Sequence, residues 1–159
     1  MLATPLKIRT FFLAQIVSYL LLSIVQASVI MAAGIILFNG HIYGNWLWLF
    51  LLVIIGNIIF LNIGFIVGGI VRNVAAAAGL GNAVAVPMMF FSGVFFPTEN
   101  LPRILEVSVR YLPLTPMLTA MRGVALEAKN FWAYPTELAL LGAWIVLTAV
   151  IAVRVFKFE

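Results

Sequence analysis

The chain has 159 residues, of which 65% are hydrophobic and 9% charged, and its mean hydropathy is +1.19. So much apolar surface excludes a soluble globular domain of this length and predicts a membrane protein. The formal net charge is +4, but we interpret the Lys and Arg residues as determinants of membrane topology and expect no nucleic-acid partner. The chain has no Cys, which excludes disulfides and thiolate metal sites.

The first predicted elements are two membrane spans, because residues 10–71 contain no Asp, Glu, Lys or Arg. A hydrocarbon core of about 30 Å needs roughly 20 apolar residues at about 1.5 Å each, so this run is long enough to cross twice. The Asn and Gly residues within 39–45 predict the turn between the crossings. We place the spans at about 11–38 and 46–71.

Two further uncharged runs predict spans at about 74–95, with a kink at Pro87, and at about 136–153. The charged segment between them, about 98–129, predicts an amphipathic helix over 101–112 and a second short helix that ends near 126. We expect Thr115 to cap the second helix, with Pro116 in its first turn. The expected fold is all-α: one membrane domain over 1–159, a polytopic bundle of four transmembrane helices with two short extracellular or re-entrant helices between the third and fourth.

Basic residues flank three of the predicted span ends and set the expected topology. They are Lys7 and Arg9, Arg72, and Arg154 with Lys157. If the spans alternate, these flanks share one side of the membrane, and the positive-inside rule makes that side the cytoplasm. We therefore expect a multi-pass protein of the plasma membrane, the inner membrane of a prokaryote, with both termini cytoplasmic and the charged segment outside.

Polar and small residues inside the spans have two possible uses. Polar side chains in lipid turn inward, where they either join helices or line a path for an amphiphilic substrate. Small residues let two helices approach closely. The polar residues are Gln15, Ser18, Tyr19, Gln26 and Asn57, and the packing glycines are Gly64, Gly68 and Gly79.

Nothing in the sequence favours catalysis, and we expect no catalytic, cofactor-binding or metal-binding residue. His41 lies in a turn without a carboxylate placed to orient it, so we interpret it as an interfacial polar residue. Glu137 lies in the first turn of the last span, where a carboxylate complements the helix dipole. The chain lacks a G-x-x-x-x-G-K-[ST] phosphate loop, so ATP would be bound by a partner.

A set of motifs resembles the permease of a type-2 ATP-binding-cassette (ABC) exporter. The stretch at 90–97, FFSGVFFP, is similar to that family's Ser-Gly-x-x-x-Pro break near the end of its fifth span. A Leu-Pro, a Leu-Pro-Leu-Thr stretch and an Arg before the last span also match. The residues that carry the resemblance are Phe91, Ser92, Gly93, Pro97, Pro102, Pro113 and Arg122.

The resemblance implies a hinged outer gate at the Ser-Gly break, although prolines that simply turn the chain would explain the same residues. It implies that the chain corresponds to spans three to six of a six-span permease, as a truncated product, a fragment or a split half. It also implies export of a drug-like, lipid or polysaccharide substrate, a second permease subunit, an ABC ATP-binding subunit and contact with membrane lipids. The alternatives are a non-transporting scaffold or assembly protein, an inactive permease fragment, and a passive channel.

Overall fold

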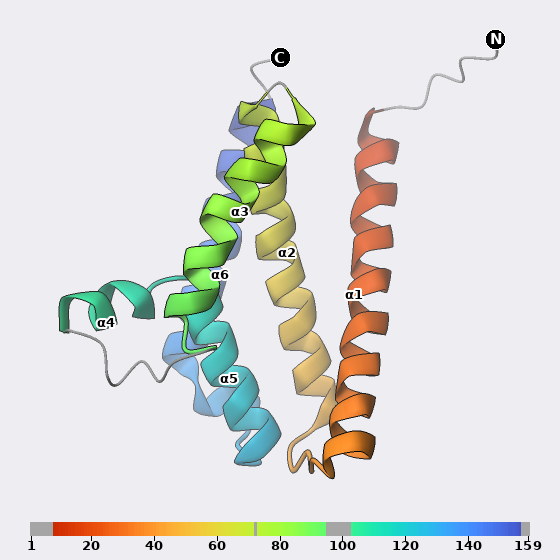
Figure 1. Ribbon diagram of the computed structural model, residues 1–159, viewed down its shortest axis with the longest axis vertical. Coiled ribbons are helices and arrows are strands. Elements are labelled where there is room, and N and C mark those ends of the chain that lie inside the picture. Colours follow the sequence, from red (N-terminus) through yellow and green to blue (C-terminus); the bar gives the residue numbers. More distant parts are fainter. Residues whose placement is uncertain (1–7, 72, 95–102, 157–159) are drawn as a thin grey trace. The chain divides into compact units, whose positions relative to one another are not determined.

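The computed structural model describes residues 8–71, 73–94 and 103–156, with the side chains of 14–71, 73–94 and 107–155. It contains six α-helices and a short 3-10 helix, with no strand among the described residues (Figure 1). Four helices are long and apolar enough to cross a membrane, over Ala14–Phe38, Trp46–Ile70, Val74–Phe91 and Pro135–Val155. The predicted all-α bundle with four spans and two intervening short helices is confirmed.

The chain divides into two compact units, Met1–Gly40 and His41–Glu159. In the first, α1 (Ile8–Phe38) is a single long helix. It ends where Asn39 takes a left-handed conformation with φ of 49° and the Gly40 N–H donates to the Gly34 carbonyl. The single membrane domain that we expect over 1–159 stays a prediction.

Asparagine side chains begin the first two helices of the second unit. For α2 (Trp46–Ile70), Oδ1 of Asn45 accepts from the Leu47 N–H at 2.9 Å. For α3 (Val74–Phe91), Oδ1 of Asn73 accepts from the Ala76 N–H at 2.6 Å. Each cap satisfies a backbone donor that a helix start leaves free, which matters more in lipid than in water. Helix α3 continues through Pro87 and ends at Phe91, before the end at 95 that the sequence suggested.

The remaining elements are α4 (Arg103–Arg110), α5 (Leu114–Leu126), the 3-10 helix η2 (Phe131–Ala133) and α6 (Pro135–Phe156). Helix α6 starts on a proline, which is suited to the first helical position. Its first turn holds Glu137 and its last turn Arg154, each charge complementing the helix dipole.

The core of the second unit lies among α2, α5 and α6. Its most deeply buried side chains come from all three helices: Leu52, Ile59, Val124, Leu141 and Thr148. At one end, the rings of Trp48 and Phe131 stack with centroids 4.7 Å apart, and Trp132 packs edge-on against Phe131 at 5.5 Å. Helices α2 and α6 therefore start at the same end and run parallel, with an aromatic cluster of the kind found at membrane interfaces.

A polar contact joins α2 to α6 inside the apolar stretch. Nδ2 of Asn62 lies 3.3 Å from Oγ1 of Thr148, and that hydroxyl also donates to the Trp144 carbonyl at 2.7 Å. Thr148 is 2% exposed. The sequence analysis selected Asn57, which is half-buried, and missed Asn62 one turn further on, although the same rule for polar residues in lipid applies to both.

We expect Thr148→Val to destabilise the bundle only slightly, because hydrogen bonds between membrane helices are worth about 0.6 kcal/mol and at most roughly 1.7 kcal/mol. Valine keeps the shape of threonine, so packing is preserved. Thermal unfolding of the purified chain in detergent measures the effect, with Thr136→Val on the exposed start of α6 as the control. A loss as large as that of a core truncation would contradict the proposed contribution of this contact.

Candidate functional site

The end of α3 is built around Ser92 and Gly93. The Ser92 side chain is 2% exposed, and its hydroxyl donates to the Met88 carbonyl one turn back. Gly93 has φ of 82°, the left-handed conformation with which glycine ends helices. A residue with a Cβ would be strained at this position. The Ser-Gly pair therefore stops the helix within the apolar region and turns the chain away.

Arg122, on α5, reaches this helix end. Its Nη2 donates to the carbonyl oxygen of Gly93 at 2.7 Å, so a cation sits at the negative end of the α3 dipole. From the sequence, Arg122 was named only among the residues that carry the family resemblance, without a partner. Its described partner is a backbone carbonyl, and Ser92, Gly93 and Arg122 come together at one place.

The other motif residues have different surroundings. Phe91, at the last turn of α3, is 40% exposed, as suits a side chain directed at lipid or another subunit. Pro113 is fully buried just before α5. Pro97 and Pro102 lie outside the described residues. Their expected part in barring continuation of the third span stays a prediction.

Helix α5 starts halfway along α2. A Cβ built on Gly56 would overlap the side chain of Met117, whereas one built on Gly44 would overlap the carbonyl of Val124. Since α5 runs antiparallel to α2, it begins beside Gly56, about 15 Å from the start of that helix, and ends beside its first turn. That depth is half of a hydrocarbon core, which is the geometry of a re-entrant helix.

The expected capping by Thr115 is wrong. Helix α5 begins at Leu114, with Pro113 in the capping position and no side-chain cap. The Thr115 hydroxyl instead donates to the Val109 carbonyl at 2.7 Å, satisfying an acceptor at the end of α4. At the same turn, the Trp144 indole N–H donates to the Tyr111 carbonyl at 2.8 Å. Side-chain donors thus satisfy the non-helical backbone between α4 and α5, as a turn within lipid requires.

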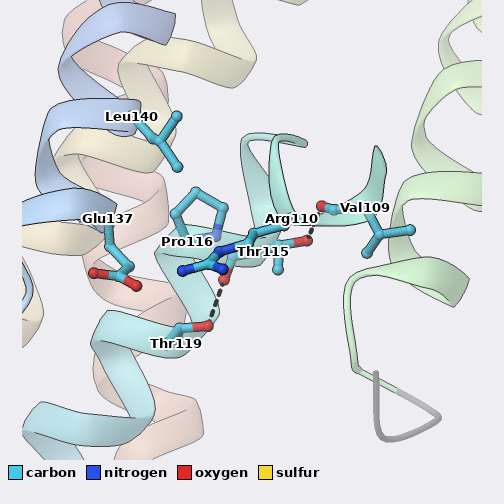
Figure 2. Close-up of a pocket in the computed structure, with 7 residues that line it drawn as sticks. All are labelled: Val109, Arg110, Thr115, Pro116, Thr119, Glu137 and Leu140. Atoms are coloured by element: carbon cyan, nitrogen blue, oxygen red, sulfur yellow. Dashed lines mark hydrogen bonds between the residues drawn. The ribbon is translucent and has the colours of Figure 1, made fainter. Parts of the chain in front are cut away.

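A polar pocket of about 230 Å³ lies among α4, α5 and α6 (Figure 2). We call it the Arg110–Glu137 pocket, after the two opposite charges that line it. Among the described residues, neither charge has a hydrogen-bond or ion-pair partner, and Glu137 is half-buried. Its other lining residues are Val109, Thr115, Pro116, Thr119 and Leu140. The sequence singled out Glu137 for its place near the helix dipole but did not connect it with Arg110, because nothing in their spacing of 27 positions places them at one pocket.

The glycines proposed for helix packing stand free within this chain. No described atom lies within 4 Å of a Cβ built on Gly64, Gly68 or Gly79. Gly64 and Gly68 line an apolar cavity of about 250 Å³ between α2 and α3, with Ala77 and Gly81 on the other side. Their role in close helix approach stays a prediction.

The polar stripe of the first span lies on α1. The Ser18 hydroxyl donates to the Ala14 carbonyl of its own helix at 2.8 Å, which satisfies it within lipid. Gln15, Tyr19 and Gln26 lie in the same helix. Whether these residues join helices or line a path stays open, as it does for Asn57 of α2.

An exposed ion pair follows α5. Nζ of Lys129 lies 2.6 Å from Oε2 of Glu127, and both side chains are 54% exposed. The hydrogen bond from Lys129 holds the pKa of the Glu127 carboxyl below its usual value, and Glu127 in turn raises the pKa of Lys129. The pair therefore favours the folded state above the ordinary pKa of a glutamate and loses that contribution as the pH falls through the lowered value. Solvent screens it, so we assign it no functional role.

The described residues contain no group of three or more His, Asp or Glu that could hold a metal ion. The candidate site is a helix break held by an arginine, next to a re-entrant helix.

Comparison with known proteins gives two matches. The family model described as "ABC-2 type transporter" matches residues 1–126. Over 140 residues, the chain is 28% identical to "ABC transporter G family member 20" of Dictyostelium discoideum, covering 85% of this chain and 19% of the relative. The chain therefore spans about a fifth of the length of that curated relative. No solved structure matches.

Proposed function

This chain belongs to the ABC-2 type transporter family, and from that premise we propose that it forms the transmembrane part of an ATP-driven exporter. It is a multi-pass membrane protein and a permease component, a kind of protein that is not itself an ATPase and that works with an ATP-binding subunit. We further propose that only the partner binds ATP and that the permease and the ATP-binding subunit are separate chains. We also propose that two permease chains pair.

The observation that carries the proposal is the bond from Arg122 to the Gly93 carbonyl. It ties the broken end of α3, a long apolar helix, to the re-entrant α5, which also packs on α2 and α6. If α3 tilts, this hydrogen bond must break, or α5 must move with α3. We propose that this linkage is an outer gate: it closes the path in one state and opens when the ATP-binding partner moves the spans.

The proposed orientation in the membrane rests on the expected cytoplasmic position of both termini. With both termini in the cytoplasm, the aromatic cluster of Trp48 and Phe131 lies at the outer interface, and α4 and α5 enter from outside. The membrane is the plasma membrane, the inner one if the host is a prokaryote. The substrate is drug-like, a lipid or a polysaccharide, moved outward. The exposed apolar faces of α1 and α3 are available for lipid and for the second permease chain.

The experiment that tests the proposal begins with the native gene tagged at its C-terminus and the product purified gently from host membranes. We expect mass spectrometry to find a phosphate-loop ATPase and a second permease chain with it. Co-reconstitution into liposomes should then give ATP-dependent movement of lipid or drug probes, absent when the ATPase carries an inactivating substitution. Recovery with non-ATPase membrane proteins alone, or no ATP-dependent movement of any probe, would instead favour the scaffold alternative.

A further inference from the structure

Two hollows of different character share a border on α6. One is the Arg110–Glu137 pocket. The other, which we call the α6 groove, is an open apolar groove of about 730 Å³ lined by Tyr111, Leu140, Gly142, Ala143, Leu147 and Val150, among others. Leu140 lines both hollows, and Arg110 of the pocket precedes Tyr111 of the groove in the chain. We refer to these two adjoining hollows together as the cleft, polar in the pocket and apolar in the groove.

The pocket presents two charges that the described part of the chain leaves unpaired. Figure 2 shows Arg110 from α4 and Glu137 from α6 directed into the same space, with Thr119 of α5 beside them. Arg110 is exposed and Glu137 is half-buried in the first turn of α6, and an opposite charge would form charge-assisted hydrogen bonds with either side chain. A ligand that carried one anion and one cation would satisfy both side chains and still fit about 230 Å³.

We propose that this cleft binds a zwitterionic phospholipid with a primary ammonium headgroup, a phosphoethanolamine lipid. The phosphate lies on the Arg110 guanidinium, whose fork of N–H donors matches phosphate oxygens. The ammonium donates to the Glu137 carboxylate, and an acyl chain lies along the α6 groove. This inference goes beyond the transport function, because the lipid would bind whether or not the chain exports a substrate.

The lining selects among phospholipids. A choline headgroup has no N–H to donate to a carboxylate. It is usually held by aromatic rings through cation–π contacts, and none of the seven described residues that line the pocket is aromatic. A phosphatidylglycerol headgroup also places its phosphate on Arg110, and its hydroxyls can donate hydrogen bonds, but it brings no positive charge to Glu137. Ethanolamine alone of the three meets Glu137 with N–H donors that carry a positive charge.

The test measures which lipid the purified chain keeps. The full chain is reconstituted in nanodiscs holding equal parts of phosphatidylethanolamine, phosphatidylglycerol and phosphatidylcholine with identical acyl chains, and retained lipids are counted by native mass spectrometry. We expect the wild type to keep phosphatidylethanolamine preferentially. Glu137→Gln should lower the ethanolamine-to-glycerol ratio about tenfold, the size of one lost charge-assisted hydrogen bond. Arg110→Gln should lower retention of both lipids by a similar factor, since both carry the phosphate.

Two further arms define the site. Gly142→Leu should fill the α6 groove and displace the lipid without unfolding the chain, because no atom of the described residues lies within 4 Å of a Cβ at Gly142. Soluble phosphoethanolamine should not compete, since it has no acyl chain for the groove. Glu127→Gln and Lys129→Gln remove the same kinds of charge from the exposed ion pair outside the cleft and should change nothing.

Three results would overturn the proposal. One is equal retention of the three lipids by the wild type. Another is an unchanged ethanolamine-to-glycerol ratio in Glu137→Gln. The third is a matched fall in the unfolding temperature of Arg110→Gln and Glu137→Gln with no change in lipid retention, which would mean that the two side chains pair with each other. Failure of the export assay would leave these results intact, so the two proposals fail separately.

Discussion

Replacing Gly44 by alanine should destabilise the second unit more than any other single methyl group added to its helices and turns. A Cβ at this position overlaps the backbone carbonyl of Val124 in α5. The neighbouring Tyr43 N–H donates to the Ala125 carbonyl at 2.9 Å, so the two segments cannot separate without losing that bond. Overpacking of this kind costs about 1–3 kcal/mol, and more where backbone must move. Thermal unfolding in detergent, followed by tryptophan fluorescence, measures the loss.

The matched control is Gly64→Ala, which adds the same methyl group to α2 where no atom lies within 4 Å. It should leave the unfolding temperature of the single chain unchanged. If Gly44→Ala were equally neutral, the close approach of α5 to the start of α2 would be disproved. If Gly64→Ala lowered the fraction of paired chains in a crosslinking assay, the expected packing role of that glycine would gain support.

Arg122→Gln should reduce ATP-driven export about tenfold while the permease still assembles with its ATPase. A hydrogen bond to a charged group contributes about 1.5–3 kcal/mol, and about 1.4 kcal/mol is a factor of ten in an equilibrium. Because Arg122 is exposed, solvent reduces the contribution of this hydrogen bond toward about 1.5 kcal/mol. Glutamine is too short to span from α5 to the Gly93 carbonyl, so the α3 end would lose its cation and its link. The measurement is the initial rate of probe movement in liposomes holding both subunits.

Lys129→Gln removes a positive charge just past the end of α5 and supplies the control for charge alone. Its export rate should equal that of the wild type. Arg122→Lys keeps the charge without the guanidinium fork and should restore part of the rate. An Arg122→Gln rate equal to the wild type, with assembly intact, would show that the bond has no part in gating.

The spans could be predicted because one physical rule governs them. In lipid, a crossing must be helical and predominantly apolar, so the absence of charge from 10 to 71 was sufficient to place α1 and α2. The same rule placed α6. The end of α3 was placed four residues late, because hydropathy does not register the left-handed turn that Gly93 makes after Phe91.

The site could be predicted only in part, because its contacts join residues far apart in the chain. Arg122 and Gly93 were selected separately, and no local pattern indicates that they touch. Thr115 was assigned to the nearest helix start, since a capping pattern considers only its own helix, whereas its hydroxyl bonds six residues back. Asn62 was missed, although the rule that selected Asn57 applies to it, because no local pattern indicates its contact. Its partner Thr148 lies 86 positions away.

The cavity between α2 and α3 makes the volume of the protein depend on the position of α3. Helix α3 buries only Met88 among its described side chains, whereas α2 buries five residues, so α3 is the least buried of the three long helices of the second unit. The gap of about 250 Å³ beside Gly64 and Gly81 is a space that a small inward tilt of α3 would reduce. If nothing fills that space, the state with α3 tilted inward occupies less volume, and hydrostatic pressure favours it. The helix that carries the Ser-Gly break is therefore the one whose position compression shifts first.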